Sequence, residues 1–181
     1  MVDLTEFESI SPYTDEQASE ALGKLADHPA VAQASRYFFP EESPDFLKNV
    51  LKQIKTIDQF QVLVMQRFVR WVIDHTAKNF SYDGISNIDT SKKFLALSNH
   101  RDIIMDPAIT QLVLHTNGIP MTEIAVGDNL ITNEAIEYLI RSNRMIKVVR
   151  GISARELYLS SQLLSKYIRL NITEQRSSIW L

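Results

Sequence analysis

Short apolar runs alternate with helical patterns throughout the C-terminal half of the chain. The apolar runs cover residues 93–98, 122–126, 145–149 and 178–181, and the segments between them carry helix caps and apolar residues at helical spacing. Strands that alternate with helices are typical of parallel sheets, because each helix returns the chain to the start of the next strand. The sequence therefore predicts an α/β fold with a partial, mostly parallel sheet and helices packed on it.

Capping residues mark the ends of the helices in this half. Asp106 suits an N-cap because its carboxylate accepts free N–H groups, and Pro107 suits the first helical position because it has no N–H to leave unpaired. That helix is expected to end at the C-cap pair that precedes Ile119. Two further helices are expected, the second opening with a capping box, at residues 133–142 and 153–170.

The N-terminal half shows helical patterns only. Capping boxes begin at Thr14 and Thr56, where a threonine hydroxyl can accept an N–H that the helix leaves unpaired. Ser43 and Pro44 stand in the order of an N-cap and a first helical residue. The expected helices cover residues 14–24, 29–39, 44–54 and 58–79.

The balance of charged residues changes near Gly84, the same position at which the helical pattern gives way to alternating apolar runs and helices. Residues 1–84 hold 8 Lys and Arg against 13 Asp and Glu, whereas residues 85–181 hold 11 against 9. We therefore expect a helical region over residues 1–84 and an α/β domain over residues 85–181.

The longest expected helix, residues 58–79, has a wide apolar face and a basic stripe. Its apolar side chains recur at helical spacing, which is typical of a helix that faces a core. Arg67 and Arg70 lie on the other face, so the helix also fits one that rests on anionic lipid. The sequence leaves both interpretations open for the apolar residues Val62, Met65, Val69 and Val72.

Composition excludes several classes of protein. Of 181 residues, 45% are hydrophobic and 23% are charged, as in an ordinary globular domain. The chain contains no run of 18 consecutive apolar residues, the length that a membrane-spanning helix needs. The acidic start of the chain has no signal-peptide pattern. The absence of cysteine excludes disulfides, thiolate metal sites and a cysteine nucleophile, and it fits a reducing compartment. A net charge of −3 does not favour nucleic-acid binding.

The chemistry is expected in the segment 98–106, which follows a predicted strand and precedes a predicted helix. A histidine beside a carboxylate can act as a general base, and His100 lies near Asp102 and Asp106. Such a base can deprotonate a substrate hydroxyl directly, and the chain has no G-x-S-x-G motif that would supply a serine nucleophile. Loop histidines and aspartates also serve as caps, and these three side chains could bind a metal, although no further ligand cluster completes a site.

Basic residues gather in the segment from the end of the predicted helix 133–142, through the third predicted strand, to the start of the last helix. Guanidinium groups bind phosphate through two parallel N–H bonds, which makes this cluster a candidate phosphate site as well as a solvated face. Aromatic residues do not interleave with it, so nucleic acid is a poor partner. The segment Gly127 to Asn129 after the second strand is typical of a turn. The basic residues are Arg141, Arg144, Lys147, Arg150 and Arg155.

The string Ser-Asn-His-Arg-Asp-x-x-x-Asp at residues 98–106 resembles the first conserved block of the glycerolipid acyltransferases, and more closely a bacterial branch of that superfamily. The resemblance continues upstream through residues 82–84 and the long helix. Downstream it continues through residues 125–130 to 146–151, so that it covers about residues 58–181.

The resemblance implies transfer of an acyl group from acyl-CoA or acyl-carrier protein to a hydroxyl of a glycerol-phosphate acceptor, with no cofactor and no metal. His100 would be the general base and an aspartate would orient it. The resemblance also implies a cytoplasmic location, with peripheral contact to the cytoplasmic face of the membrane. The implied substrate-binding residues are Asn99, Arg101, Lys147, Arg150 and Arg155, of which Arg150 would contact phosphate.

Two features depart from the family pattern. The family usually has four residues between the histidine and the aspartate, whereas five separate His100 from Asp106 and Met105 holds the usual position. Asp106 remains the expected partner because this branch has the longer spacing, and Asp102 is the rival. The phosphate-binding third block would follow residues 178–181, so we expect this chain to be the N-terminal portion of an acyltransferase.

Two other classes of function stay open at this point. One is a non-catalytic fragment whose helices bind a membrane or a protein. The other is a metal-dependent hydrolase that uses His100 and Asp102.

Overall fold

The computed structural model describes residues 4–150 and 153–181. Contacts divide the chain into two compact units. The sheet unit comprises residues 4–12, Gly84–Thr132 and the described part of Arg144–Leu181, and the helical unit comprises Tyr13–Asp83 and Asn133–Asn143. The second predicted helix of the α/β half therefore belongs to the helical unit.

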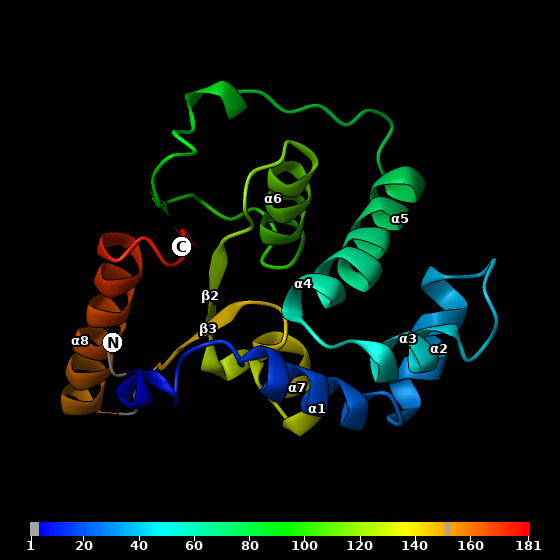
Figure 1. Cartoon of the computed structure of the whole chain (residues 1–181), viewed down its shortest axis with the longest axis horizontal. Helices are drawn as coiled ribbons and strands as arrows, with labels where there is room; N and C mark the ends of the chain where they lie inside the picture. The colour runs from blue at the N-terminus through cyan, green and yellow to red at the C-terminus, as the bar shows by residue number, and fades with distance from the viewer. Residues whose placement is uncertain (1–3, 151–152) are drawn as a thin grey trace. The chain divides into compact units, whose positions relative to one another are not determined.

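The sheet has four strands, all parallel, in the order β1-β4-β2-β3 (Figure 1). Ala96 and Ile124 both pair with Trp180, which fixes β4 between β1 and β2. This arrangement confirms the predicted α/β fold with a parallel sheet. The strands are β1 (Leu95–Ala96), β2 (Glu123–Gly127), β3 (Met145–Val148) and β4 (Ile179–Trp180).

Two helices of the sheet unit cross over between strands. Helix α6 (Met105–Thr116) leads from β1 to β2, and α8 (Ala154–Thr173) leads from β3 back to β4. The two crossovers run in opposite directions along the sheet, so right-handed connections place α6 and α8 on opposite faces, as Figure 1 shows. Because all four strands are parallel, their carboxyl ends lie at one edge of the sheet, which we call the carboxyl edge. The loops that follow the strands begin there.

Helix α8 closes one core of the sheet unit. Ile146 of β3 and Ile179 of β4 are fully buried beneath it, together with Phe7 from the short 3-10 helix η1 (Thr5–Phe7). The rings of Phe7 and Tyr167 meet edge to face, with centroids 5.3 Å apart. Such a pair contributes about 1 kcal/mol beyond the area it buries.

The start of α6 differs from the prediction. The helix begins at Met105, so Asp106 lies inside the first turn and is not the N-cap. The reason is that the carboxylate of Asp102 accepts the N–H groups of Ile104 and Met105, which lets the helix begin earlier. The predicted end is confirmed, because Asn117 is the C-cap and Gly118 adopts a φ of 71°.

The helical unit confirms the all-helical prediction for the N-terminal half. Thr14 and Gln17 form the expected capping box, and α1 packs against α3 and α7. The core contains Leu22, Leu51 and Phe60. The elements of the helical unit are α1 (Asp15–Leu25), α2 (Pro29–Phe38), α3 (Phe46–Gln53), α4 (Ile57–Phe60), the π-helix η2 (Gln61–Met65), α5 (Gln66–Thr76) and α7 (Glu134–Arg141). The short 3-10 helix η3 (Ile85–Asn87) belongs to the sheet unit.

Two helix predictions in this unit are wrong in detail. Helix α3 begins at Phe46 and not at Pro44, because residues 43–46 form a turn in which the Phe46 N–H binds the Ser43 carbonyl. The long helix ends at Thr76 and contains a π-helical segment. A π turn inserts an extra residue and rotates the faces that follow, so that Val64 is buried where the predicted stripe had Val62.

Arg67 of the predicted basic stripe is paired within the helical unit. Arg67 forms an ion pair with Glu42 at 2.6 Å, and its guanidinium lies over the rings of Phe39 and Phe46. Arg67 therefore faces its own unit. In the described residues, no helix combines the length and the apolar character that crossing a membrane requires.

Candidate active site

The carboxyl edge of the sheet gathers the residues that the sequence singles out. The segment with His100 follows β1, the segment with Asp128 follows β2, and Arg150 follows β3. In open α/β sheets, ligands bind at this edge, outside the ends of the strands. The main-chain bond from the Ser98 N–H to the Leu181 carbonyl, 3.1 Å long, holds the end of β1 to the end of β4.

Two carboxylates hold the loop between β1 and α6. Asp106 Oδ2 accepts the N–H groups of Arg101 at 2.7 Å and Asp102 at 3.0 Å. Asp102 Oδ1 in turn accepts the N–H groups of Met105 at 2.7 Å and Ile104 at 2.8 Å. These bonds to Met105 and Ile104 lower the pKa of Asp102 below its usual value. The loop is therefore fixed by charge-assisted hydrogen bonds.

His100 is exposed on this loop and lies against an aromatic ring. Its imidazole centroid is 4.7 Å from that of Trp180 in β4, with 55° between the ring planes. Within the described residues, His100 makes no hydrogen bond to Asp102 or Asp106. The structure thus brings the three predicted residues into one loop but does not join the histidine to a carboxylate.

The other predicted residues of this loop lie on its surface. Asn99 and Arg101 are both exposed, and the backbone N–H of Arg101 binds Asp106. The guanidinium of Arg101 is therefore available to a ligand at the carboxyl edge.

A tight turn after β2 positions Arg150. The Arg150 N–H donates to Asp128 Oδ1 at 3.0 Å. The Arg150 side chain passes directly over Gly127. A Cβ built on that glycine would lie 3.1 Å from Arg150 Nε and would overlap Asn129 Oδ1. The segment that the sequence identified only as a turn is thus the support of the arginine.

This close approach leads to a testable prediction. Gly127→Ala is expected to displace the Arg150 side chain and to lower the affinity for inorganic phosphate several-fold, as measured by titration calorimetry. Gly23→Ala is the matched control, because a Cβ there meets nothing within 4 Å. Equal phosphate affinity in the two variants would contradict the assigned role of Gly127.

The remaining basic residues do not form one surface. Lys147 lies within β3, half-buried, and its N–H binds the Ile10 carbonyl. Arg155 is exposed in the first turn of α8. Arg144 precedes β3 and Arg150 follows it, so they lie at opposite edges of the sheet. Arg141 belongs to the helical unit, and Gly151 of the resembling motif lies outside the described residues.

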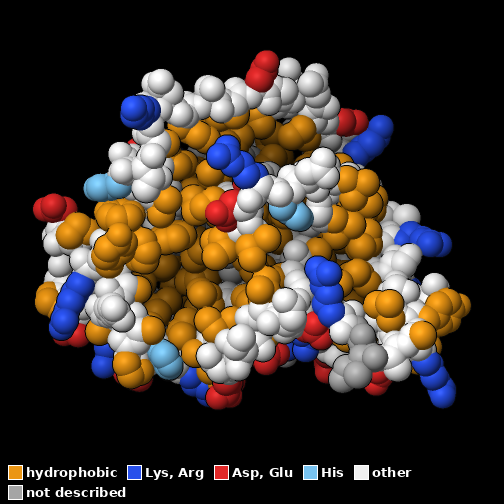
Figure 2. Space-filling view, turned by 180° about the vertical axis from the view of Figure 1, so that it is seen from behind, with side chains coloured by type: hydrophobic (Ala, Val, Ile, Leu, Met, Phe, Trp, Pro, Cys, Tyr) orange, Lys and Arg blue, Asp and Glu red, His pale blue; other side chains and the backbone are white. Residues whose placement is uncertain are grey.

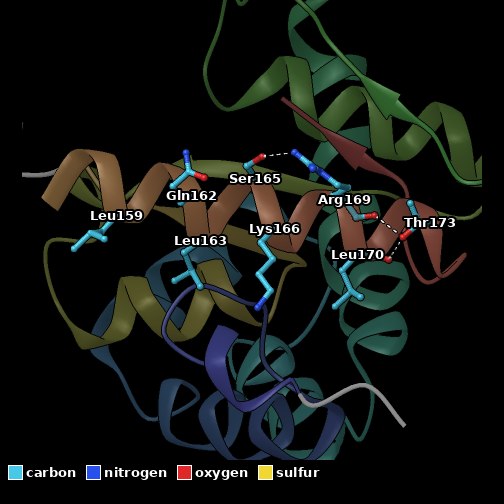
Figure 3. Close-up of a pocket in the computed structure, with 8 residues that line it drawn as sticks. All are labelled: Leu159, Gln162, Leu163, Ser165, Lys166, Arg169, Leu170 and Thr173. Atoms are coloured by element: carbon cyan, nitrogen blue, oxygen red, sulfur yellow. Dashed lines mark hydrogen bonds between the residues drawn. The ribbon is translucent and has the colours of Figure 1, made fainter. Parts of the chain in front are cut away.

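A groove of about 640 Å³ runs along α8, away from these loops (Figure 3). Leu163, Lys166 and Leu170 point to one side of the helix, and Ser165 and Arg169 point to the other, where Arg169 binds Ser165. Lys166 is paired with Glu6 at 2.6 Å. The groove therefore contains none of the predicted site residues.

Trp180 belongs to the candidate site, although its sequence context does not indicate this. In the sequence it is part of an apolar run, residues 178–181. Trp180 reaches His100 because β4 inserts beside β1, with Ala96 opposite Trp180. The order of strands in a sheet is not visible in a single sequence, so no sequence signal could have found this contact.

Metal ligands do not cluster in the described part of the chain. Among residues 4–150 and 153–181, no group of three or more His, Asp or Glu side chains could hold a metal ion. His100, Asp102 and Asp106 accordingly do not form a ligand set, since the two carboxylates bind backbone N–H groups.

Comparison of the chain with models of protein families, with curated proteins and with solved structures finds no match. The functional assignment therefore depends on the loop after β1, on the arginine after β3 and on the resemblance of the sequence motif.

Proposed function

We propose that the protein is an acyltransferase that moves a fatty acyl group from a thioester to a hydroxyl of a glycerol-phosphate acceptor. The observation that carries the proposal is an exposed histidine on a loop braced by two carboxylates, at the carboxyl edge of a parallel sheet. Arg150 lies at the same edge and supplies a phosphate-binding group. The motif at residues 98–106 supports the same reaction through its resemblance to glycerolipid acyltransferases.

In the proposed step, the acceptor phosphate binds the guanidinium of Arg150 and the free hydroxyl points at His100. His100 takes the hydroxyl proton while the oxygen attacks the thioester carbonyl carbon. The new C–O bond forms, the C–S bond breaks, and the imidazolium returns its proton to the departing sulfur. The reaction needs no cofactor, because the thioester already activates the acyl group.

An aspartate orients the base in this proposal, and Asp106 is the first choice. Its Oδ2 holds two N–H groups, while its Oδ1 has no hydrogen-bond partner among the described residues. Catalytic hydrogen bonds often form only when substrate is bound. His100 would turn from Trp180 toward this oxygen in the loaded enzyme. Asp102 is the second choice, and its present bonds support the helix start.

Other residues on the same edge complete the proposed substrate site. Arg101 is exposed on the loop after β1, Arg155 is exposed in the first turn of α8, and Lys147 is half-buried in β3. Asn99 would support the loop next to His100 in this proposal. On this proposal the donor is acyl-CoA or acyl-carrier protein, and the enzyme works in the cytoplasm.

The direct test is an acyl-transfer assay on the purified chain. Labelled acyl-CoA and acyl-carrier protein would each be offered with glycerol 3-phosphate and with lysophosphatidate. We expect turnover with at least one pair of donor and acceptor. Absence of turnover with all four pairs would overturn the proposal.

Arg150 provides a second test of the same reaction. Arg150→Ala is expected to raise the KM for the acceptor about tenfold, because a charge-assisted bond to phosphate is worth roughly 1.5–3 kcal/mol, and to change kcat much less. Arg169→Ala is the control, since Arg169 is exposed in the same unit and its guanidinium binds Ser165 on α8. An unchanged acceptor KM would remove Arg150 from the site.

A further inference from the structure

The helical unit contains a cavity of about 220 Å³ that the proposed reaction does not use. Its described lining residues all belong to this unit and come from the segments 25–34, 47–64 and 133–139. Native cores hold few voids larger than a water molecule, which takes about 30 Å³ in the liquid. A hollow several times that size is therefore a candidate binding site. We call it the α2–α7 cavity, and its floor consists of the buried side chains of Val31, Leu47, Leu51, Phe60 and Val64.

The floor of the α2–α7 cavity offers no partner to water. Its five side chains are apolar members of the core of the helical unit, and the half-buried Leu25, Ala34 and Leu139 pack against that core. A buried water needs two to four polar partners, whereas apolar cavities of about 150 Å³ stay dry and take up benzene. By the same ratio of volume to atoms, the α2–α7 cavity has room for about nine non-hydrogen atoms of an apolar molecule.

Polar groups of the cavity lie at its mouth, which we place at the exposed lining residues His28, Ala30 and Asn133. His28 Nδ1 accepts the Ala30 N–H at 3.3 Å and caps α2, and Asn133 Oδ1 accepts the Ile136 N–H at 3.0 Å and caps α7. Because Nδ1 of His28 is an acceptor, the neutral ring carries its proton on Nε2. The mouth therefore supplies a hydrogen-bond donor. Figure 2 shows hydrophobic side chains in recesses of the surface on one face of the molecule.

We propose that the α2–α7 cavity binds a small neutral molecule with an apolar body and one hydrogen-bond acceptor. The body would lie against Leu51 and Phe60, and the acceptor would receive the Nε2–H of His28. A charged ligand is excluded, because the described lining residues include no Lys, Arg, Asp or Glu that could pair with a buried ion. The site shares no residue with the candidate active site, so the inference stands independently of acyl transfer.

The test is a nuclear magnetic resonance titration of the ¹⁵N-labelled full chain with acetophenone, isopropylbenzene and benzoate. The three molecules have the same number of non-hydrogen atoms and differ in the group attached to the ring. We expect saturable shifts of backbone amides in α2, α3 and α7 with acetophenone and with isopropylbenzene. Benzoate is expected to bind at least tenfold more weakly than acetophenone, because its carboxylate would lose its hydration without gaining a cation.

Filling the cavity from within tests its location. Ala34→Leu adds three carbon atoms at a half-buried lining position of α2 and is expected to weaken binding of both neutral ligands at least tenfold. Ala32→Leu is the matched control, because Ala32 is exposed on the same helix and does not line the cavity. Ala135→Leu fills the cavity from α7 and serves as a second variant if the first does not fold.

The acceptor is tested at His28. His28→Ser keeps a side-chain oxygen that can cap α2 but removes the Nε2–H donor. This variant is expected to bind acetophenone about fivefold more weakly, as for the loss of one hydrogen bond, and to bind isopropylbenzene as before. Unchanged affinity for acetophenone would overturn the assigned acceptor.

Three results would overturn the cavity proposal as a whole. One is the absence of saturable shifts with both neutral ligands. Another is equal affinity of the Ala34→Leu and Ala32→Leu proteins for isopropylbenzene. The third is binding of benzoate as tight as that of acetophenone. Each result is read without an activity assay, so a failure of acyl transfer leaves this test unaffected.

Discussion

Replacing His100 with alanine is expected to lower acyl transfer by about 10²–10⁴-fold, the range that a general base contributes. His100 is exposed and its ring lies against that of Trp180, so the substitution should leave the fold intact. Turnover by the purified variant, measured beside its urea unfolding curve, separates a loss of chemistry from a loss of structure.

His115 supplies the matched control for this experiment. It is also an exposed histidine of the sheet unit, but it lies in the last turn of α6, at the opposite end from the reactive loop. His115→Ala should keep full activity. Full activity in the His100 variant would instead exclude it as the base and leave the loop with a structural role.

Replacing Tyr167 with phenylalanine is expected to destabilise the sheet unit by about 1–3 kcal/mol at neutral pH. The Tyr167 hydroxyl donates to Glu123 Oε2 at 2.8 Å, and both residues are buried. The variant leaves the buried carboxyl group without this donor, and an unpaired buried group costs its full desolvation energy. Urea unfolding of the two proteins at the same pH measures the difference.

The pH dependence of stability provides a second readout of this pair. Burial raises the pKa of Glu123 above its usual value, against the smaller opposing effects of Tyr167, Ser177, Arg144 and Arg176. The native state then binds more protons than the unfolded state, so the stability contributed by Glu123 is complete below pH of about 4.5 and falls as the pH rises through the native pKa.

Glu123→Gln is the matched variant for this readout. Its amide oxygen can still accept the Tyr167 hydrogen bond, but it carries no charge to desolvate. We expect the glutamine variant to be more stable than the natural protein at neutral pH and to lose that advantage as the pH approaches 4.5. A natural protein whose stability, relative to the variant, rises as the pH is raised from 4.5 to neutral would contradict the raised pKa.

Local sequence signals predicted much of the fold. The capping boxes at Thr14 and Ser153 appear as expected, and so does the helix end at Gly118 with its positive φ. These signals work because a cap is satisfied by residues three positions away. The short apolar runs became strands for a similar reason, since a buried parallel strand needs continuous apolar residues.

Local signals failed at the start of α6. The sequence predicted Asp106 as the N-cap, whereas the structure uses Asp102 for the helix start and Asp106 for the loop before it. The π-helical segment from Gln61 is a similar case, because a single inserted residue changed which apolar side chains are buried. Small differences in local geometry decided both outcomes.

The sequence by itself determined the fold class, the position of the His100 loop between a strand and a helix, and the presence of an arginine after the third strand. Only the tertiary structure decided that β4 lies between β1 and β2, that Trp180 therefore contacts His100, and that Gly127 supports Arg150. It also decided that α7 belongs to the helical unit. The physical reason is that caps and strand patterns depend on neighbours in the chain, whereas strand order and side-chain contacts depend on packing between segments far apart in sequence.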